Sequence, residues 1–435
     1  MAKICRRCRA ETPEDVRFIV HSGESYCPVC YAKIRERRSR ASLMLYPAFL
    51  LWAWMLTFAS EPSSQVGWFF FNLVFMLVCQ WAVILPHELG HALTARLGGL
   101  RVYRIVSGYG PLLWTASLLG GMLQVHAYPF GGFTVMTDSR ERGFRFRKFM
   151  AVSGGPLVNL LFIAVALPWL GDPLAFKGFT QAWQPLQCFV AANALILMWN
   201  LLPRRVVATT VPVDSDGLLL FKTPFLSPPE VRKELSYHYL MHGVEALEKR
   251  NFADALRWNQ DGLRRFPEVV LLRNNLGVTQ LRLGLYELSR EEFLAVAVSP
   301  DVEPDMKALA QTNVAVADIL LDRPDLLPEA DRASTEAMAR LSWLPIVKGT
   351  RGAVLIALGK VDEGLVLARQ ALEGQEDQLQ RAFDACVLAL GHKAKEQIAE
   401  GTKYLDLAES LHPACLLLDR ARKAYGREPL PVSPQ

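Results

Sequence analysis

Two histidines and a glutamate lie close together near residue 90. The segment His87-Glu88-Leu89-Gly90-His91 places the histidines four residues apart, so on a helix both imidazoles face one side and can bind the same zinc ion. Glu88 directly follows the first histidine, where its carboxylate can act as general base toward an activated water molecule. These residue types at this spacing predict zinc-assisted hydrolysis, the chemistry that cleaves peptide bonds.

The motif ends an uncharged run that begins at Val66 and is long enough to cross a bilayer. An unpaired carboxylate at the centre of a membrane helix costs about 2.5 to 3.5 kcal/mol, so a glutamate there is expected to be functional. The alternative is that two histidines fall four residues apart by chance on a buried helix. The membrane setting favours the zinc site.

Four uncharged runs are long enough to span the hydrocarbon core, and they are Leu43–Ser60, Val66–Pro86, Phe149–Gly171 and Gly178–Pro203. Lysine and arginine gather at residues 33–40, 96–104, 140–148 and 204–205, which all fall on one side of these runs. The positive-inside rule therefore predicts that both termini lie in the cytosol. It also places His87 close to the cytoplasmic boundary.

The stretch Ile105–Thr137 lacks Lys, Arg, Asp and Glu, but glycines divide it into pieces too short to span a membrane. We predict a small re-entrant β-hairpin, with strands at Met122–Tyr128 and Phe133–Thr137 and a turn at Pro129–Gly132. An exposed strand edge beside the zinc could hold an unwound substrate peptide by strand addition. The alternative is that the hairpin only packs against the helices.

Four of the eight cysteines form two Cys-x-x-Cys pairs, Cys5/Cys8 and Cys27/Cys30. This spacing predicts a tetrahedral structural zinc site, a second Zn²⁺ beside the catalytic one. Disulfide pairing is the alternative, but the reducing cytosol expected for this segment disfavours it. The remaining cysteines lie in apolar runs and are expected to be buried hydrophobes: Cys79, Cys188, Cys386 and Cys415.

The net charge of +5 is concentrated at the N-terminus, where residues 1–40 hold ten Lys/Arg against five Asp/Glu. A basic segment beside a membrane span indicates cytoplasmic retention and attraction to anionic lipid. Topology therefore accounts for these charges, and a nucleic-acid partner is not expected.

After Pro228 the sequence changes to amphipathic helices with a repeat near 34 residues, the period of tetratricopeptide repeats. The first unit carries Gly243, Phe252, Ala255 and Pro267, and the second carries Gly277, Gly284, Tyr286, Phe293 and Pro300. A third unit around Ala315 is weak, and a fourth includes Gly352, Leu355, Gly359, Val361 and Leu365. We predict a curved helical solenoid with a groove for a protein partner, a plain helical bundle being the alternative.

A catalytic zinc usually takes three protein ligands, so the two histidines need a partner from elsewhere in the chain. Asp214 and Asp216 follow the fourth apolar run and lie at the depth inferred for His87. His126, from the predicted hairpin, is a third candidate. The residues alone leave this choice open.

The motifs resemble the site-2 protease family of intramembrane zinc metallopeptidases. The family's marks occur here in order as His87–His91, Gly155-Pro156-Leu157-Val158-Asn159, and Asp216-Gly217 preceded by Asn200-Leu201-Leu202-Pro203. The resemblance covers residues 66–220 and implies that Asp216 is the third ligand, Glu88 the general base and Asn159 a contact for unwound substrate. One departure is that Arg204–Val213 separates Pro203 from the aspartates, which keeps Asp214 in question.

The sequence predicts a mainly α protein with a polytopic membrane protease core, a small zinc ribbon and a helical repeat domain. The expected boundaries are 1–40 for the ribbon and basic segment, 41–220 for the protease, 228–426 for the repeats and 427–435 for a disordered tail. We expect a multi-pass protein of a bacterial cytoplasmic membrane that cleaves membrane-protein substrates in or near their transmembrane segments. The alternative function is a non-proteolytic membrane scaffold acting through its repeats.

Overall fold

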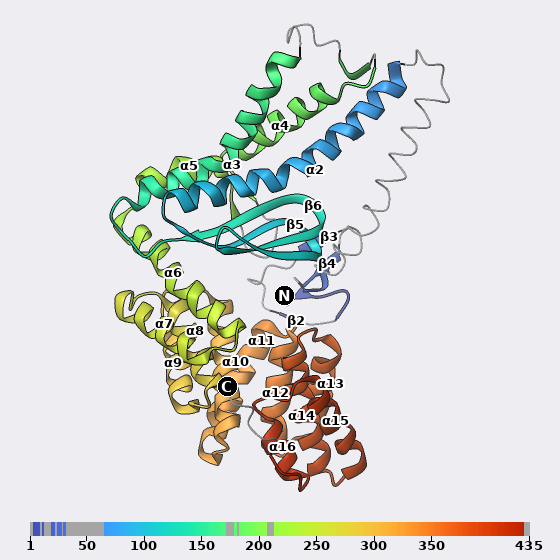
Figure 1. Ribbon diagram of the computed structural model, residues 1–435. Helices are drawn as coiled ribbons and strands as arrows, with labels where there is room; N and C mark the ends of the chain where they lie inside the picture. Colours follow the sequence, from blue (N-terminus) through green and yellow to red (C-terminus); the bar gives the residue numbers. More distant parts are fainter. Residues whose placement is uncertain are drawn as a thin grey trace. The chain divides into compact units, whose positions relative to one another are not determined.

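The computed structural model describes residues 3–8, 11–12, 19–21, 24–27, 29–31, 65–170, 178–180, 182–206 and 213–429 (Figure 1). The chain divides into two compact units. One is continuous, Ile34–His238, and contains the zinc motif. The other joins two distant parts of the sequence, Met1–Lys33 and Tyr239–Gln435.

Three apolar helices in mutual contact form the frame of the continuous unit, and they are α2 (Gln65–Leu97), α3 (Phe144–Ala166) and α4 (Pro185–Leu201) (Figure 1). Gly67–Leu97 and Phe144–Trp169 are long and apolar enough to cross a bilayer, and α4 is a shorter apolar helix. Both longer helices match predicted runs. The predicted run Leu43–Ser60 lies outside the described residues.

In the fourth predicted run the α-helix begins only at Pro185, because proline suits the first helical position. The described residues of that run before Pro185 are not α-helical. Gly178–Thr180 makes a short 3₁₀ turn, η2, and Asn72 of α2 holds the residues around it. The Asn72 amide donates to the carbonyl oxygens of Phe179 at 3.0 Å and Ala182 at 2.6 Å. A buried amide in an apolar helix thus satisfies backbone groups where α4 begins.

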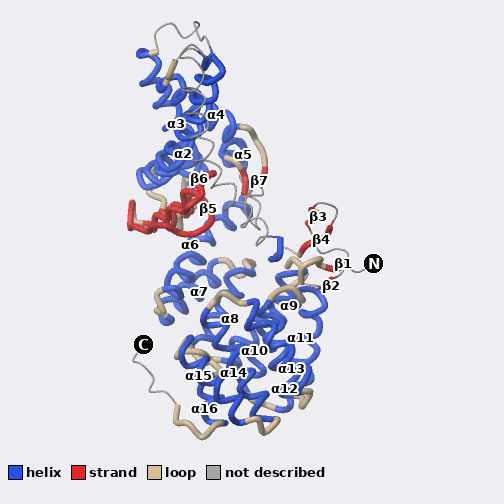
Figure 2. The backbone as a smooth tube through the Cα atoms, turned by 90° about the vertical axis from the view of Figure 1, so that its right-hand side faces the viewer, coloured by secondary structure: helices blue, strands red, loops and turns tan. Residues whose placement is uncertain are grey.

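A β-sheet follows α2 and consists of β5 (Arg101–Leu118) and β6 (Gly121–Thr137) (Figure 2). The ribbon folds back on itself, so Arg104–Ser107 pairs with 122–125 on one side and with 132–135 on the other. The predicted sheet is confirmed, but the predicted turn at Pro129–Gly132 is wrong. The turn lies at Leu119 and Gly120, both with positive φ, and residues 129–132 form an irregular part of β6.

The connection after α4 brings the distal aspartates back toward the membrane helices. β7 (Arg205–Val206) pairs with β8 (Val213–Asp214), and α5 (Asp216–Lys222) follows directly, capped by the Ser215 hydroxyl. The short 3₁₀ helix η3 (Thr223–Phe225) ends this connection. A Cβ at Gly217 would overlap the carbonyl of Leu201, so only glycine lets the start of α5 approach the end of α4 this closely.

In the other unit, the N-terminal ribbon consists of two short antiparallel ladders. β1 (Lys3–Ile4) pairs with β2 (Glu11–Thr12), and β3 (Ile19–His21) pairs with β4 (Glu24–Tyr26). Each Cys-x-x-Cys pair follows the end of a strand, the first β1 and the second β4. The ladders therefore bring the two pairs together.

Consecutive α-helices form the rest of this unit, and the first of them begins in the continuous unit (Figure 2). They are α6 (Pro228–Glu248), α7 (Phe252–Arg265), α8 (Val270–Arg282), α9 (Tyr286–Val298), α10 (Pro304–Leu321), α11 (Leu327–Leu341), α12 (Pro345–Ala357), α13 (Val361–Gly374), α14 (Gln378–Ala394), α15 (Ile398–Leu411) and α16 (Leu418–Ala424). The 3₁₀ helix η4 (Pro324–Leu326) precedes α11.

The repeat positions fall where helical hairpins need them. Phe252 and Tyr286 begin α7 and α9, and Ala255 and Phe293 are completely buried within the same helices. The prediction of tetratricopeptide-like helical repeats is confirmed by this succession of helices. At the predicted tail, Arg427 pairs with Asp406 and Glu409, and residues 430–435 lie outside the described part of the chain.

One buried carboxyl in the repeats lacks a well-formed hydrogen bond. Asp384 of α14 is fully buried, and although the Gln380 side chain approaches its carboxyl group, neither oxygen has a hydrogen bond of good geometry. Burial raises the pKa of this carboxyl from 3.8 to about 8, because the charged form would lose its hydration. Asp384 is therefore protonated in the folded repeats at neutral pH.

Asp384 should make the repeats less stable as the pH rises from about 4 to about 8. In that window the carboxyl is ionised in the unfolded chain but keeps its proton in the folded chain. Raising the pH therefore lowers the free energy of unfolding, by on the order of a few kcal/mol over the whole window. Asp384→Asn should remove this dependence, as measured by the unfolding temperature at pH 5 and pH 8. Asp362→Asn, on an exposed aspartate, is the control and should leave the dependence unchanged.

Candidate zinc active site

The two histidines of α2 and the first residue of α5 meet in one place. His87 Nε2 lies 3.1 Å from Asp216 Oδ2, His91 Nε2 lies 3.4 Å from Asp216 Oδ1, and the two Nε2 atoms are 3.2 Å apart. Each of the three side chains offers one possible ligand atom, and these atoms lie within 4.8 Å of one another. The set joins residues separated by more than a hundred positions in the sequence.

These distances suit a tetrahedral zinc ion. Ligand bonds of about 2.0 to 2.1 Å at tetrahedral angles separate the ligand atoms by about 3.3 Å, close to the separations found here. Space for an ion is kept by Gly155 of α3, since a Cβ at this position would overlap Nε2 of both His87 and His91. Two imidazoles and one carboxylate are a typical ligand set for catalytic zinc.

Each histidine is held by its other ring nitrogen. His87 Nδ1 lies 2.6 Å from Asn159 Oδ1, and His91 Nδ1 lies 3.1 Å from the carbonyl oxygen of Ala151. The Ala151 carbonyl can only accept and the Gly155 amide, 3.3 Å from the same nitrogen, can only donate, so the contacts of His91 Nδ1 fit either tautomer. With Asn159 Oδ1 as acceptor, His87 Nδ1 carries the proton and its Nε2 is the nitrogen available to a metal.

Of the three candidates for third ligand, only Asp216 lies beside the histidines. Burial raises the pKa of the Asp216 carboxyl, but its interaction with the imidazoles of His87 and His91 lowers that pKa by more, so the net shift is downward. Asp214 instead pairs with Arg205 at 3.1 Å and with Lys222 at 2.8 Å. His126 bonds to the carbonyl oxygen of Gly110 at 2.7 Å.

Glu88 is buried beside the first histidine and held by the sheet. Thr134 of β6 donates its hydroxyl to Glu88 Oε2 at 2.9 Å and lies 3.1 Å from the Glu88 carbonyl oxygen. The neighbouring residues Gly131, Gly132 and Phe133 are exposed. An accessible part of β6 therefore adjoins the carboxylate.

Asn159, predicted to contact substrate, is completely buried and bonds to His87 and to Asn193. Contact with substrate stays a prediction, and the observed contacts orient the histidine. Sequence reasoning missed Thr134 and Asn193, and it noted Asn200 only within a motif, although the Asn200 amide nitrogen lies 3.2 Å from His87 Nε2. Asparagines within uncharged runs are the signal that could have found two of them.

Residues 75–198 match a known protein family, described as peptidase family M50. This segment is a peptidase family M50 domain. It contains the zinc motif, Gly155, Asn159 and Asn193. The predicted resemblance to site-2 proteases is confirmed, and the two long apolar helices fit an integral membrane protein.

Curated relatives support the same assignment. A protein of Nostoc sp., named as a candidate zinc metalloprotease, is 33% identical over 117 residues, which are 24% of this chain and 31% of that protein. The regulator of sigma-E protease RseP of Escherichia coli is 28% identical over 141 residues, 29% of this chain and 30% of that protein. The chain spans about a third of the length of these relatives.

Solved structures resemble the helical repeats only loosely. A crystal structure of MamA has 18% sequence identity and a TM-score of 0.30, and covers 46% of this chain and 98% of MamA. A TPR protein of Thermus thermophilus has 21% identity and a TM-score of 0.35, with coverages of 43% and 98%.

The two aspartates provide a matched test of the zinc ligands. Asp216→Asn should remove the catalytic zinc, because a neutral amide replaces the anionic ligand beside two imidazoles. Asp214→Asn should retain this zinc, because Asp214 is engaged by Arg205 and Lys222 instead. Zinc per chain, measured by elemental mass spectrometry on purified protein, decides between them. Equal loss in both variants would contradict the observed ligand set.

Proposed function

We propose that the chain is an intramembrane zinc metalloprotease that hydrolyses peptide bonds in or near the transmembrane segments of membrane proteins. The observation that carries this proposal is the cluster of His87, His91 and Asp216, with Glu88 beside it, in an M50 domain. A non-proteolytic protein would have no need of a buried carboxylate beside two potential metal ligands.

His87, His91 and Asp216 would hold the zinc, which would supply a Lewis acid for the scissile carbonyl and for a water molecule. Glu88 takes a proton from the water molecule as the water oxygen attacks the carbonyl carbon, and it passes the proton to the nitrogen as the C–N bond breaks. The Thr134 hydroxyl keeps the Glu88 carboxylate oriented for both transfers. Asn159 and the Ala151 carbonyl orient the rings of His87 and His91.

The position of β6 suggests how a substrate is presented. A transmembrane helix hides its amides in its own hydrogen bonds, so it must unwind before cleavage. We propose that the unwound segment lies against the exposed residues Gly132 and Phe133, next to Glu88. Asn200, whose amide lies beside His87 Nε2, and Asn159 are candidates to bind or align its carbonyl groups.

We further propose that the protein resides in a bacterial cytoplasmic membrane with both termini in the cytosol. The basic flanks of the apolar helices support this orientation. Its partners are then lipid, substrate proteins and proteins recruited by the helical repeats, and nucleic acid is not required. If the repeats recruit substrates, exchanging them for the repeats of another protein should change which membrane proteins are cleaved. The proteomic comparison described in the next paragraph measures this.

Glu88→Gln should abolish proteolysis while zinc stays bound, because the amide cannot accept the proton but fills the same space. Comparative proteomics of cells carrying wild type or Glu88→Gln should reveal membrane proteins that accumulate uncut in the variant. The alternative function, a membrane scaffold acting through its repeats, predicts identical protein profiles. Zinc content of the purified variant is the control for an intact site.

We predict that catalysis depends on the hydroxyl group of Thr134. Thr134→Val keeps the shape of the side chain but removes the donor to Glu88, and kcat should fall by about tenfold or more. Thr134→Ser should keep most of the activity because it retains the donor. The measurement is cleavage of an unfolded fluorogenic peptide by reconstituted protein. A Ser variant as slow as the Val variant would assign Thr134 to packing alone.

A further inference from the structure

The N-terminal ribbon and the helical repeats share one buried cluster. From the ribbon it includes the cysteines Cys5, Cys27 and Cys30, and from the repeats Ala308, Ala337, Leu341, Trp343 and Val347. Tyr26 and Val29 of the ribbon pack at its margin. The repeat residues come from α10, from α11 and from α12 with the turn before it. Segments about three hundred residues apart in the sequence thus meet through apolar contacts within one compact unit.

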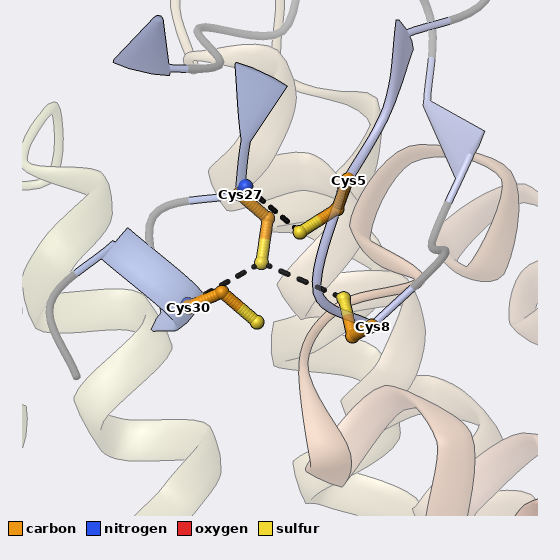
Figure 3. Close-up of side chains that lie close together, drawn as sticks. All are labelled: Cys5, Cys8, Cys27 and Cys30. Atoms are coloured by element: carbon orange, nitrogen blue, oxygen red, sulfur yellow. Dashed lines mark hydrogen bonds between the residues drawn. The ribbon is translucent and has the colours of Figure 1, made fainter. Parts of the chain in front are cut away.

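The four ribbon cysteines converge on a common point (Figure 3). Their sulfur atoms all lie within 4.8 Å of one another, and Cys8 Sγ lies 3.8 Å from Cys27 Sγ. A disulfide would require about 2.05 Å, whereas four Zn–S bonds of about 2.3 Å separate tetrahedral sulfurs by about 3.8 Å. The Cys27 amide donates to Cys5 Sγ at 3.3 Å, and the Cys30 amide donates to Cys27 Sγ at 3.4 Å. Such amide bonds stabilise thiolate ligands.

The ribbon is too small to fold by its own packing. Its described strands have two or three residues each, and segments below about 40 residues usually need a metal, disulfides or a partner to fold. None of the eight cysteines is in a disulfide. A metal ion at the four sulfurs would order the ribbon and hold it in the shape that covers Trp343 and Val347.

We propose that Cys5, Cys8, Cys27 and Cys30 bind one zinc ion, and that this ion holds the ribbon on α10–α12 as a clasp between the N-terminal ribbon and the repeats. The membrane domain is then an insertion between two parts of one compact unit that the zinc ion holds together. The occupant of the apolar face at Leu341, Trp343 and Val347 is the ribbon itself. Loss of the metal would release the ribbon and expose that face.

The clasp also constrains membrane topology. Ribbon and repeats must lie on the same side of the membrane, so the chain between them crosses an even number of times. If α2, α3 and α4 make three crossings, a fourth is required before α2. The apolar sequence Leu43–Ser60 is long enough to be that crossing.

The metal is tested on the full chain in detergent micelles. Wild type should contain two zinc ions per chain, one for each ligand cluster, and Cys8→Ser should contain one. Cys8 is the suitable position because its side chain is exposed, so serine removes a ligand without opening a cavity. Iron in place of zinc, or two zinc ions remaining in Cys8→Ser, would overturn the assignment.

The clasp is tested by hydrogen exchange on the same samples. Loss of the ribbon zinc should speed exchange at residues 337–347, while residues 382–389 of α14 keep their protection and show that the repeats remain folded. Asp216→Asn, which removes the other proposed zinc, should leave residues 337–347 unchanged. Chelation of wild type followed by zinc addition should reverse the effect. Unaltered exchange at 337–347 after zinc loss would refute the clasp.

Epitope tags at the two ends test the topological consequence. In sealed inside-out vesicles an added protease should remove both tags, and in right-side-out vesicles it should remove neither. Removal of only one tag in either preparation would place the ends on opposite sides and overturn the proposal.

Discussion

The active-site geometry depends on giving every nitrogen of two buried imidazoles a defined partner. An imidazole binds metal through one nitrogen only if the other carries the proton, and in an apolar interior that proton needs an acceptor. Asn159 and the Ala151 carbonyl, both from α3, supply the acceptors. The contact between α2 and α3 therefore determines the chemistry of a motif that lies entirely on α2.

That contact requires the two helices to approach at backbone distance. Gly90, within the zinc motif, lies against Gly154, and a Cβ on either residue would overlap the other's carbonyl group. Because apolar side chains gain little from leaving lipid, close packing and internal hydrogen bonds must hold such helices together. The buried link from Asn159 to Asn193 extends the support to α4. Small residues and asparagines thus position the site in an otherwise apolar frame.

The sequence was sufficient for local patterns and for motifs whose spacing carries chemistry. The histidine spacing, the aspartate before Gly217 and the paired cysteines each indicated a cluster that the structure brings together. The hairpin turn was missed because Leu119 adopts positive φ, which leucine rarely does, while the Pro-Gly segment at 129–132 carried the stronger turn signal. Thr134 could not be found because its role depends on pairing between strands and on contact with α2.

The docking of the ribbon on the repeats was also beyond sequence reasoning, since it depends on apolar contacts between residues about three hundred positions apart. Such contacts carry no periodic signal, and both partners look complete in isolation. The contact nevertheless restricts where the ribbon can lie. A terminal ribbon that merely precedes the membrane domain could lie anywhere its linker allows. A ribbon that shares a core with the repeats must lie on the same side of the membrane as they do, so the number of membrane crossings between them must be even.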